Sequence, residues 1–322
     1  DFFNMSKQLE ELKKAVSTDI VKLIVVKGLR RTGKTSLILV ALKTIETPFI
    51  YVDCRTVEPL SYPMFQTILL SKISKLVKSS FKGKLQDVLK RIREVELAGV
   101  KISIERKQEL ITSALESLPS KTVLVLDEAQ YLAPLAGVKK LLAYIYDHVE
   151  NVKTIVSGSE IGVLSDFIGE NNPKSPLYGR PWIEVETSKL TRKQAETFLK
   201  QGFKQAKFKI SQEEIEEASD KLNGVIGWLT FYGWNTVTLK SHKKGLKRTL
   251  REGSSITLSE LSKFLETRGL AKPKYEEILK ALALKPMKWS ELKRQVENTL
   301  NIKIANNQFT HYLKELRKYS II

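Results

Sequence analysis

The stretch "GLRRTGKTS", residues 28–36, determines how the first part of this chain is expected to fold. Gly28, Gly33, Lys34 and Thr35 match the pattern G-x-x-x-x-G-K-[ST] at every position. The two glycines permit left-handed turns that point successive backbone N–H groups inward, and a helix beginning at Lys34 adds its positive N-terminal end. A short apolar run precedes the stretch and an apolar amphipathic segment follows it. The pattern therefore predicts a strand, a phosphate-binding loop and a helix in succession.

The side chains of this loop have distinct predicted roles. Lys34 is expected to reach the β- and γ-phosphates of a nucleotide, and the hydroxyl of Thr35 is expected to ligate Mg²⁺. The predicted nucleotide-binding residues are Gly28, Arg31, Thr32, Gly33, Lys34, Thr35 and Ser36. The motif does not specify Arg30 and Arg31, so these two arginines either touch the nucleotide or a neighbouring domain, or form a solvent-facing pair.

A second stretch, "TVLVLDEAQ" at residues 122–130, supplies two carboxylates directly after an apolar run. Asp127 is predicted to bind the metal through water. Glu128 is predicted to orient and polarise an attacking water as a general base. Hydrolysis needs such a base, whereas transfer to a substrate hydroxyl does not, so the pair favours a hydrolytic site. The plainer alternative is an Asp-Glu pair that only starts a helix.

Four further polar residues lie near the ends of predicted strands. Ser157 and Ser159 either sense the γ-phosphate by a hydrogen bond or are turn residues on either side of Gly158. Arg180 either bridges to the γ-phosphate, in its own chain or in a neighbour, or pairs with a loop carboxylate. Asp53 either helps to organise the water or metal, or caps a turn.

Residues 20–187 alternate short β-branched runs with amphipathic stretches, which predicts a parallel sheet with crossover helices. The continuous apolarity of the runs predicts strands that are buried on both faces. The expected strands are "IVKLIVV" (20–26), "FIYVD" (49–53), "TVLVLD" (122–127), "VKTIVS" (152–157) and "WIEVE" (182–186). Residues 62–118 are expected to be mostly helical, except that "GVKISIE" (99–105) is expected to form a short strand or hairpin.

After residue 187 the strand pattern stops and helices are expected. "SQEEIEEASDKL" begins with Ser211 and has Glu214 at the capping-box position. Three short amphipathic stretches from about residue 272 have the spacing of a helix-turn-helix domain. The sequence therefore predicts a P-loop α/β core at 1–187, an all-α lid at 188–269, and a winged-helix domain at 270–322 that is either complete or truncated.

The last amphipathic stretch, "ANNQFTHYLKELRKYS" (305–320), has two distinct faces. The residues expected to face the core are Phe309, Leu313 and Leu316. The residues expected to face outward are Asn307, Gln308, His311 and Lys314. This outward set suits base edges and phosphates in a major groove, although a protein contact or a solvated face is the alternative. In the lid, "SHKKGLKR" (241–248) adds four Lys or Arg side chains that either bind phosphate or stay solvated.

Composition narrows the class of protein. The 322 residues are too many for one small core, and no apolar run approaches the roughly 18 residues that span a bilayer. A single cysteine and a charged N-terminal stretch unlike a signal peptide predict a cytoplasmic protein that does not bind membranes. The net charge of +18 suits nucleic acid or an acidic partner, or alternatively a charge-rich surface of the kind found in thermophiles.

Together these residues resemble the archaeal ATPase family, a branch of the AAA+/STAND P-loop NTPases. The matching stretches, collinear over about residues 20–235, are "GLRRTGKTSL", "YVDCR", "LVLDEAQ", "VSGSEIGVL", "SPLYGR" and "NGVIGWL". The resemblance implies a five-stranded ATPase core, a helical lid and a C-terminal winged helix, with ATP and Mg²⁺ as ligands. It implies the roles given above for Lys34, Thr35, Asp127 and Glu128, and it supports Arg180 as a sensor of the nucleotide state.

The chain departs from the family pattern at two places. The family's N-terminal Arg-Glu pair is replaced by "FFNMSKQ" (2–8). The family's Gly-x-Pro turn in the lid reads Gly224-Val225-Ile226-Gly227 here, so the apolar contact to adenine is assigned to Ile226.

The expected function is an ATP-hydrolysing switch whose lid and winged helix move between ATP and ADP states. One alternative is a replication-initiator-like DNA-binding ATPase, and another is a nucleotide-binding regulatory module with negligible turnover. The expected partners are ATP or ADP, double-stranded DNA at the winged helix and basic lid, and a second copy of the chain.

Overall fold

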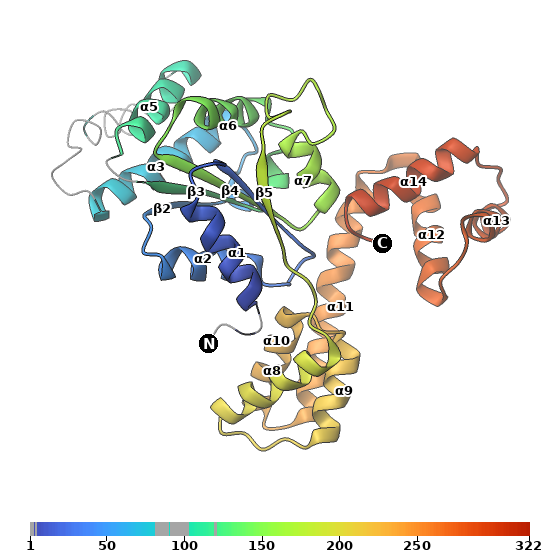
Figure 1. The fold of residues 1–322 in the computed structure, drawn as a ribbon. Coiled ribbons are helices and arrows are strands. Elements are labelled where there is room, and N and C mark those ends of the chain that lie inside the picture. Colours follow the sequence, from blue (N-terminus) through green and yellow to red (C-terminus); the bar gives the residue numbers. More distant parts are fainter. Residues whose placement is uncertain (1–2, 4, 81–89, 91–102, 119–120) are drawn as a thin grey trace. The chain divides into compact units, whose positions relative to one another are not determined.

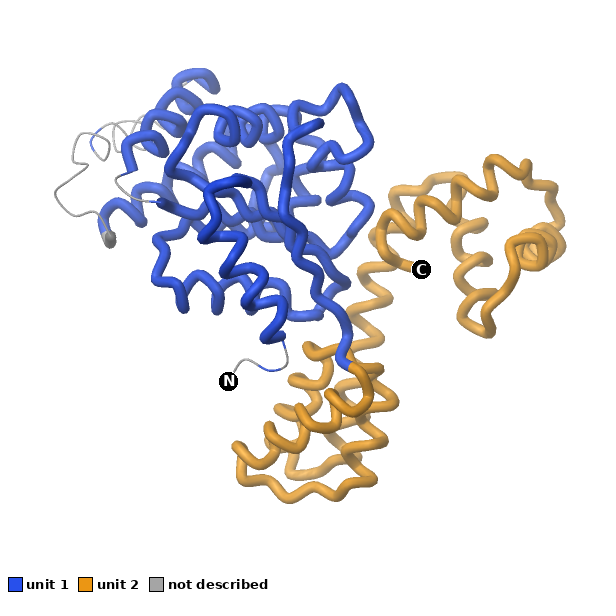
Figure 2. The backbone as a smooth tube through the Cα atoms, viewed as in Figure 1, with its two compact units in different colours: residues 1–190 blue, residues 191–322 orange. Residues whose placement is uncertain are grey.

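A computed structural model describes the chain except for residues 1–2, 4, 81–89, 91–102 and 119–120. The chain divides into two compact units, residues 1–190 and 191–322, which Figure 2 colours separately. This division falls close to the predicted end of the α/β core at residue 187. The predicted boundary between a lid and a winged helix lies inside the second unit and stays a prediction.

The first unit contains a parallel five-stranded sheet with the strand order β2-β3-β4-β1-β5 (Figure 1). The predicted α/β fold with a five-stranded parallel sheet is therefore confirmed. The helices and strands of this unit are α1 (Ser6–Ser17), β1 (Leu23–Lys27), α2 (Lys34–Thr44), β2 (Phe49–Asp53), α3 (Tyr62–Ser80), α5 (Ile104–Glu116), β3 (Thr122–Asp127), α6 (Ala136–His148), β4 (Val152–Gly158), α7 (Ile161–Ile168) and β5 (Trp182–Glu186). Two short 3₁₀ helices, η1 (Cys54–Thr56) and η3 (Ala129–Leu132), follow β2 and β3.

All five apolar runs form strands, because β-branched side chains pack well on a buried pleated surface. β3 and β4 are buried at every position, and β1 is buried at all but its last residue. The prediction of burial on both faces is confirmed for these three inner strands. It is wrong for β2 and β5, which lie at the two edges of the sheet and have partly exposed positions.

Helices cover both faces of this sheet, α1 and α2 on one side and α3, α5 and α6 on the other (Figure 1). Alternate residues of a strand point to opposite faces. Accordingly, Leu23 and Val25 of β1 belong to the apolar core that includes side chains of α3, α5 and α6. The sheet therefore lies between two layers of helices, which cover its faces and not the ends of its strands.

The region between β2 and β3 is helical where it is described, as expected, because α3 and α5 lie there. The strand or hairpin predicted at 99–105 falls partly outside the described residues, which exclude 99–102. Ser103 is the N-cap of α5, and its hydroxyl accepts a hydrogen bond from the backbone N–H of Arg106. The strand prediction is therefore wrong for Ile104 and Glu105, where this cap starts a helix.

The second unit is helical, and no strand occurs among its residues 191–322, all of which are described. Its α-helices are α8 (Arg192–Gln205), α9 (Gln212–Leu222), α10 (Ile226–Leu239), α11 (His242–Glu266), α12 (Lys272–Leu284), α13 (Trp289–Leu300) and α14 (Asn306–Lys318). The predicted capping box of Ser211 and Glu214 starts α9, and a second one of Thr191 and Gln194 starts α8. Of the helices formed by described residues, none is long and apolar enough to cross a membrane.

The helices α12, α13 and α14 share an apolar cluster with the end of α11. Phe309 and Leu316 of α14 are fully buried and Leu313 is partly buried, as the sequence predicted. The four residues expected to face outward from α14 are exposed. Phe264 and Leu265 of α11 complete the cluster, so the C-terminal helices use apolar side chains from before residue 270.

Candidate nucleotide-binding site

Three strands carry the predicted site residues to one edge of the sheet. β1, β3 and β4 are parallel, and β4 lies between the other two. The loop that begins at Gly28 follows β1, Asp127 ends β3, and Ser157 lies near the end of β4. Because the carboxyl ends of parallel strands meet at the same edge, residues separated by about a hundred positions become neighbours there.

The loop after β1 turns through glycine conformations. Gly28 has φ +153° and Gly33 has φ +92°, and Gly33 is the N-cap of α2. A Cβ on Gly28 would collide with the backbone carbonyl and hydroxyl oxygens of Thr187. Thr32 is buried, and its hydroxyl oxygen lies 2.7 Å from that of Thr187 and 2.7 Å from the carbonyl oxygen of Leu29. The side chain of Thr32 thus fastens the loop to the end of β5.

The ammonium group of Lys34 lies inside this loop. Nζ donates to the carbonyl oxygens of Gly28 at 2.9 Å and Leu29 at 3.0 Å, and lies 3.9 Å from Oε1 of Glu128. Burial lowers the pKa of Lys34 below its ordinary value, while the carboxylates of Glu128 and Asp127 act in the opposite direction. The first backbone N–H groups of α2 have no acceptor within their own helix, so they and Lys34 form a group of donors suited to phosphate.

Asp127 is held by three hydroxyl groups. Its Oδ2 accepts hydrogen bonds from Thr35 at 2.7 Å and Tyr51 at 2.6 Å, and its Oδ1 accepts one from Ser157. Burial, aided by the hydrogen bond to Asp127, raises the pKa of Tyr51, so this phenol remains a donor. The carboxylate is itself completely buried.

The oxygen atoms of Thr35 and Asp127 are the kind of ligand that Mg²⁺ prefers. Within the described ranges, no group of three or more His, Cys, Asp and Glu side chains is arranged to hold a metal by itself. A hydroxyl and a carboxylate joined by a 2.7 Å hydrogen bond nevertheless fit Mg²⁺, because this ion commonly takes one or two protein ligands together with phosphate oxygens and water.

Glu128 follows Asp127 in a left-handed backbone conformation, with φ +56°. Its Oε2 accepts hydrogen bonds from Gln130 Nε2 at 2.5 Å and Ser159 Oγ at 2.7 Å. Its Oε1 is the oxygen nearest Lys34. A non-glycine residue in this conformation costs roughly 1–2 kcal/mol. The turn aims the carboxylate back toward the phosphate loop.

The remaining loop residues are more exposed. Arg30 pairs with Glu160, with Nη2 2.9 Å from Oε1, so it links the loop to the segment after β4. Arg31 is exposed and has φ +63°, and Ser36 is exposed in the first turn of α2. Their contact with a nucleotide stays a prediction.

Asp53 caps a turn. It accepts hydrogen bonds from the backbone N–H of Arg55 at 3.1 Å and from the guanidinium of the same residue at 2.8 and 2.7 Å. These bonds hold the pKa of Asp53 below its ordinary value. Of the two roles considered for Asp53, the cap is the one observed.

Arg180 lies near the amino ends of the strands, whereas the phosphate loop follows their carboxyl ends. It precedes β5, whose first residue, Trp182, pairs with Leu23 at the start of β1. Its guanidinium pairs with Asp147, with Nε 3.0 Å from Oδ1. The five residues of β1 separate it from Gly28 by at least about 13 Å of strand. The predicted contact between Arg180 and a phosphate bound in its own loop is therefore wrong. The predicted contact with a phosphate bound by a neighbouring chain stays a prediction.

Ile226 is the first residue of α10 in the second unit. Its predicted contact with adenine stays a prediction.

Two residues of the site, Tyr51 and Gln130, were not found from the sequence. Gln130 stands two positions after Glu128 in "DEAQ", and this short spacing could have indicated a contact between the two side chains. Tyr51 offered none, because its contact with Asp127 depends on β2 lying next to β3.

Two family models match this chain. One is described as an ATPase domain predominantly from Archaea and matches residues 2–229. The other is described as the C-terminal winged helix-turn-helix domain of MCM proteins and matches residues 270–322. No curated protein matches the chain.

Solved structures with the same fold include the Walker-type ATPase PABY2304 of Pyrococcus abyssi, which is 30% identical. That match covers 99% of this chain and 90% of the other, with a TM-score of 0.84. The ORC2 protein of Aeropyrum pernix, in ADPNP and ADP complexes, is 14% identical, with coverage of 99% and 87% and a TM-score of 0.65. The ORC1 protein of the same organism, in complex with DNA, is 16% identical, with coverage of 100% and 85% and a TM-score of 0.57. The two ORC structures show similarity of fold alone.

Proposed function

Since the chain belongs to the family of ATPase domains found predominantly in Archaea, we propose that it binds ATP with Mg²⁺ and hydrolyses the bond to the γ-phosphate. The observation that carries this proposal is the pair of neighbouring carboxylates beside Lys34. Asp127 is bonded to the hydroxyl of Thr35, and Glu128 lies 3.9 Å from Lys34. One carboxylate is placed to hold a metal and the other to accept a proton.

Binding of the triphosphate rests on Lys34 and the backbone N–H groups at the start of α2. Lys34 exchanges its two carbonyl acceptors in the loop for phosphate oxygens, and the helix N-terminus adds its partial positive charge. Thr35 and Asp127 are the residues that would hold Mg²⁺, and the bound ion would neutralise charge on the phosphates. Ser157 and Tyr51 fix the orientation of Asp127 by hydrogen bonds that do not involve the nucleotide.

Hydrolysis rests on Glu128. A water in line with the γ-phosphate donates a proton to this carboxylate as the new P–O bond forms and the bond to the β-phosphate bridging oxygen breaks. Gln130 and Ser159 both bond to Oε2, which leaves Oε1 on the side of Lys34. This asymmetry supports Oε1 as the oxygen that accepts the proton.

A pair of variants tests the proposal. Glu128→Gln keeps the size of the side chain and one acceptor oxygen for Gln130 and Ser159 but removes the base, so we expect turnover to fall about 10²- to 10⁴-fold with little change in ATP affinity. Lys34→Ala should abolish ATP binding. Turnover is followed by phosphate release and affinity by a fluorescent ATP analogue, with and without EDTA. Unchanged turnover in Glu128→Gln would refute the base, and unchanged affinity in Lys34→Ala would refute the loop.

A second candidate function is binding to double-stranded DNA, which the exposed side of α14 favours. Asn307, Gln308, His311 and Lys314 are all exposed on this helix, and the segment matches a winged helix-turn-helix model. Amide, imidazole and ammonium groups suit base edges and phosphates in a major groove. On this proposal the protein is an ATP-dependent switch that acts on DNA. The alternative, a DNA-binding ATPase that resembles a replication initiator, has the same layout of domains.

Self-association through Arg180 belongs to the same proposal. An arginine at the edge of the sheet opposite its own loop can reach a phosphate only in a neighbouring copy. Arg180→Ala should then lower turnover at high protein concentration and leave ATP affinity unchanged.

A further inference from the structure

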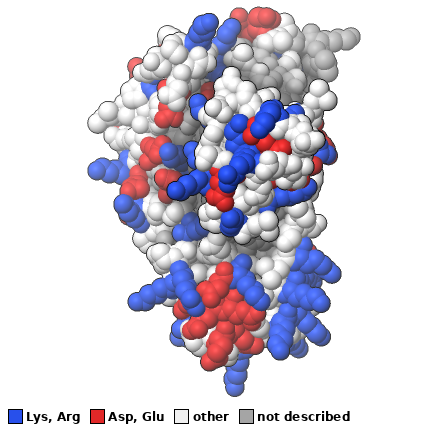
Figure 3. Space-filling model, turned by 90° about the vertical axis from the view of Figure 1, so that its right-hand side faces the viewer, with Lys and Arg blue, Asp and Glu red and all other residues white. Residues whose placement is uncertain are grey.

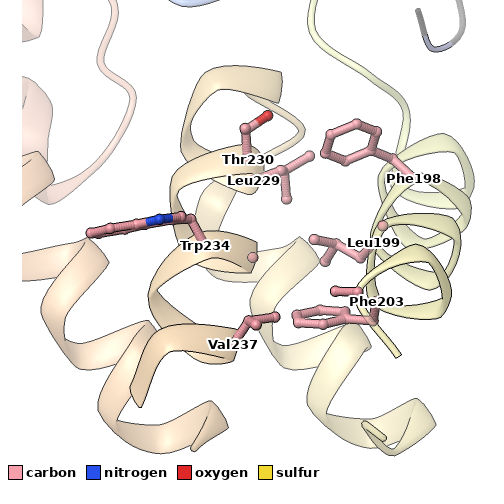
Figure 4. A pocket seen from close by; sticks show the side chains of 10 residues that line it. Phe198, Leu199, Phe203, Leu229, Thr230, Trp234 and Val237 are labelled. Carbon is pink, nitrogen blue, oxygen red and sulfur yellow. The ribbon is translucent and has the colours of Figure 1, made fainter. Parts of the chain in front are cut away.

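The second unit has an open apolar groove between α8 and α10 (Figure 4). Its cavity volume is about 320 Å³. The ten residues that line it are Phe198, Leu199, Gly202, Phe203, Ala206, Leu229, Thr230, Gly233, Trp234 and Val237. None of these ten is charged. The one hydroxyl among them, on Thr230, donates to the carbonyl of Ile226 at 2.8 Å within its own helix.

Two glycines keep this groove open. A Cβ placed on Gly202 of α8 or on Gly233 of α10 would have no heavy atom within 4 Å, so open space lies above both. Glycine inside a helix costs about 1 kcal/mol relative to alanine. Both helices therefore carry a residue that weakens them and leaves room for another molecule.

One wall of the groove lies beside a strongly basic helix. Trp234 lines the groove with 56% of its surface exposed, and the guanidinium carbon of Arg248 on α11 is 5.8 Å from its ring centroid. Residues 240–252 contain six Lys or Arg and one acidic residue, Glu252, which pairs with Arg248 at 2.8 Å, so the segment keeps an excess of five positive charges. Helical spacing puts Lys244, Arg248 and Arg251 in one row on the side of Trp234. In the lower part of Figure 3, basic side chains lie on both sides of an acidic patch.

The rim on the other side of the groove is neutral. Gln201 and Gln205 of α8 are exposed and adjoin the lining residues by helical spacing. An occupant of this groove therefore meets apolar walls, an amide rim on one side and a row of cations on the other.

We propose that this groove binds an amphipathic helix of a partner protein, with apolar side chains between α8 and α10 and acidic side chains facing Lys244, Arg248 and Arg251. A small polar ligand does not fit, because such sites contain placed polar groups that fix its orientation. Nucleic-acid bases fit less well, because their polar edges would be buried without partners. The proposal does not depend on ATP hydrolysis.

The test uses the full chain and a fluorescein-labelled synthetic helix of 18 residues, with leucines at positions i, i+3, i+4 and i+7 and glutamates on either side. We expect saturable binding by fluorescence anisotropy, and binding at least tenfold weaker for the same residues in scrambled order. Trp234→Ala should weaken binding about tenfold, because its exposed indole borders the groove on the side of Arg248 and not at its centre.

Gly233→Leu separates occupation of the groove from damage to the fold. Leucine fills the open space and is a better helix former than glycine, so this variant should fold and lose the peptide. Thr197→Leu is the matched control, because Thr197 is exposed on α8 but does not line the groove. Unchanged affinity in Gly233→Leu would overturn the proposal.

Charge reversal tests the basic row. Lys244→Glu combined with Arg251→Glu should weaken the acidic peptide at least tenfold and strengthen a peptide with lysine in place of glutamate. Lys34→Ala should leave peptide affinity unchanged, so loss of the proposed ATPase and loss of this site are distinguishable. If oligothymidine binds and depends on Trp234 while the acidic peptide does not bind, the occupant is a nucleic acid and the proposal fails.

Discussion

Glu128 and Asp127 are adjacent in the chain but are held by different partners. Three hydroxyl donors fix Asp127, whereas an amide and a hydroxyl fix one oxygen of Glu128. A carboxylate that accepts hydrogen bonds on both oxygens is oriented for a static role, such as holding a cation. One with donors on a single oxygen keeps the other available to water. The hydrogen-bond donors around each carboxylate, more than the residue type, thus distinguish the proposed metal ligand from the proposed base.

Gln130 is the donor to Glu128 that is easiest to remove without loss of volume. Gln130→Met deletes the 2.5 Å hydrogen bond to Oε2 and leaves Ser159 as its remaining donor. We expect kcat to fall roughly 10- to 100-fold because the base is less well placed, with ATP affinity unchanged. Ser159→Ala should act in the same direction, and the double variant should cost less than the product of the two effects. A loss of ATP affinity without a loss of kcat would contradict this positioning role.

Gly28 has a positive φ angle that residues with a side chain rarely adopt. Gly28→Ala combines φ +153° with a collision against Thr187, so we expect lower thermal stability and weaker ATP binding. Gly202→Ala is the matched control, because its Cβ would enter open space in a helix. That control should raise stability by about 0.5–1 kcal/mol. Equal effects of the two substitutions in thermal unfolding would show that Gly28 is not required by the loop.

At the scale of elements, one arginine adds to the apolar contacts between α11 and the C-terminal helices. Arg268 forms an ion pair with Glu315 of α14 at 2.9 Å. Its guanidinium carbon lies 4.1 Å from the ring centroid of Phe264 and 4.8 Å from that of Tyr319. The end of α11 and the end of α14 therefore meet on one planar cation, which helps to explain why residues before 270 belong to the C-terminal core.

Arg268→Lys keeps the charge and removes the planar group. We expect a loss of stability on the order of 1 kcal/mol, because an ammonium stacks less well on the aromatic rings than a guanidinium does. Hydrogen exchange of α12, α13 and α14 should become faster, while exchange of the sheet stays the same. Lys280→Arg, on the exposed side of α12, is the control. Unaltered exchange in Arg268→Lys would mean that stacking of the guanidinium does not contribute to holding these helices.

At the scale of the whole molecule, the net charge of +18 makes any DNA contact sensitive to salt. Attraction between a cationic protein and phosphates weakens as ions are added. Only contacts at specific side chains change the slope of the dependence. Net charge therefore predicts association in general, and the exposed residues of α14 predict where it occurs.

Lys314→Ala should reduce the slope of log K against log salt by about one, the contribution of one phosphate contact. Binding to a duplex is measured by anisotropy at several salt concentrations, with and without ATP. Lys280→Ala should leave the slope unchanged, because Lys280 pairs with Glu277 at 2.5 Å. A weak signal that does not depend on salt, or equal slopes for the two variants, would exclude α14 from the contact. A change in affinity with ATP would support the switch.

The sequence by itself determined the strands, the phosphate loop, the caps of the lid helices and the buried side of α14, because each is set by a local pattern of apolarity, glycine or capping residues. It also placed Asp127 and Glu128 at a strand end. Only the tertiary structure decided that Tyr51, Ser157, Gln130 and Ser159 hold these two carboxylates, and that Arg180 lies at the far edge of the sheet. Those facts depend on strand order and direction, since inserting β4 between β1 and β3 brings together side chains whose separation in sequence carries no signal.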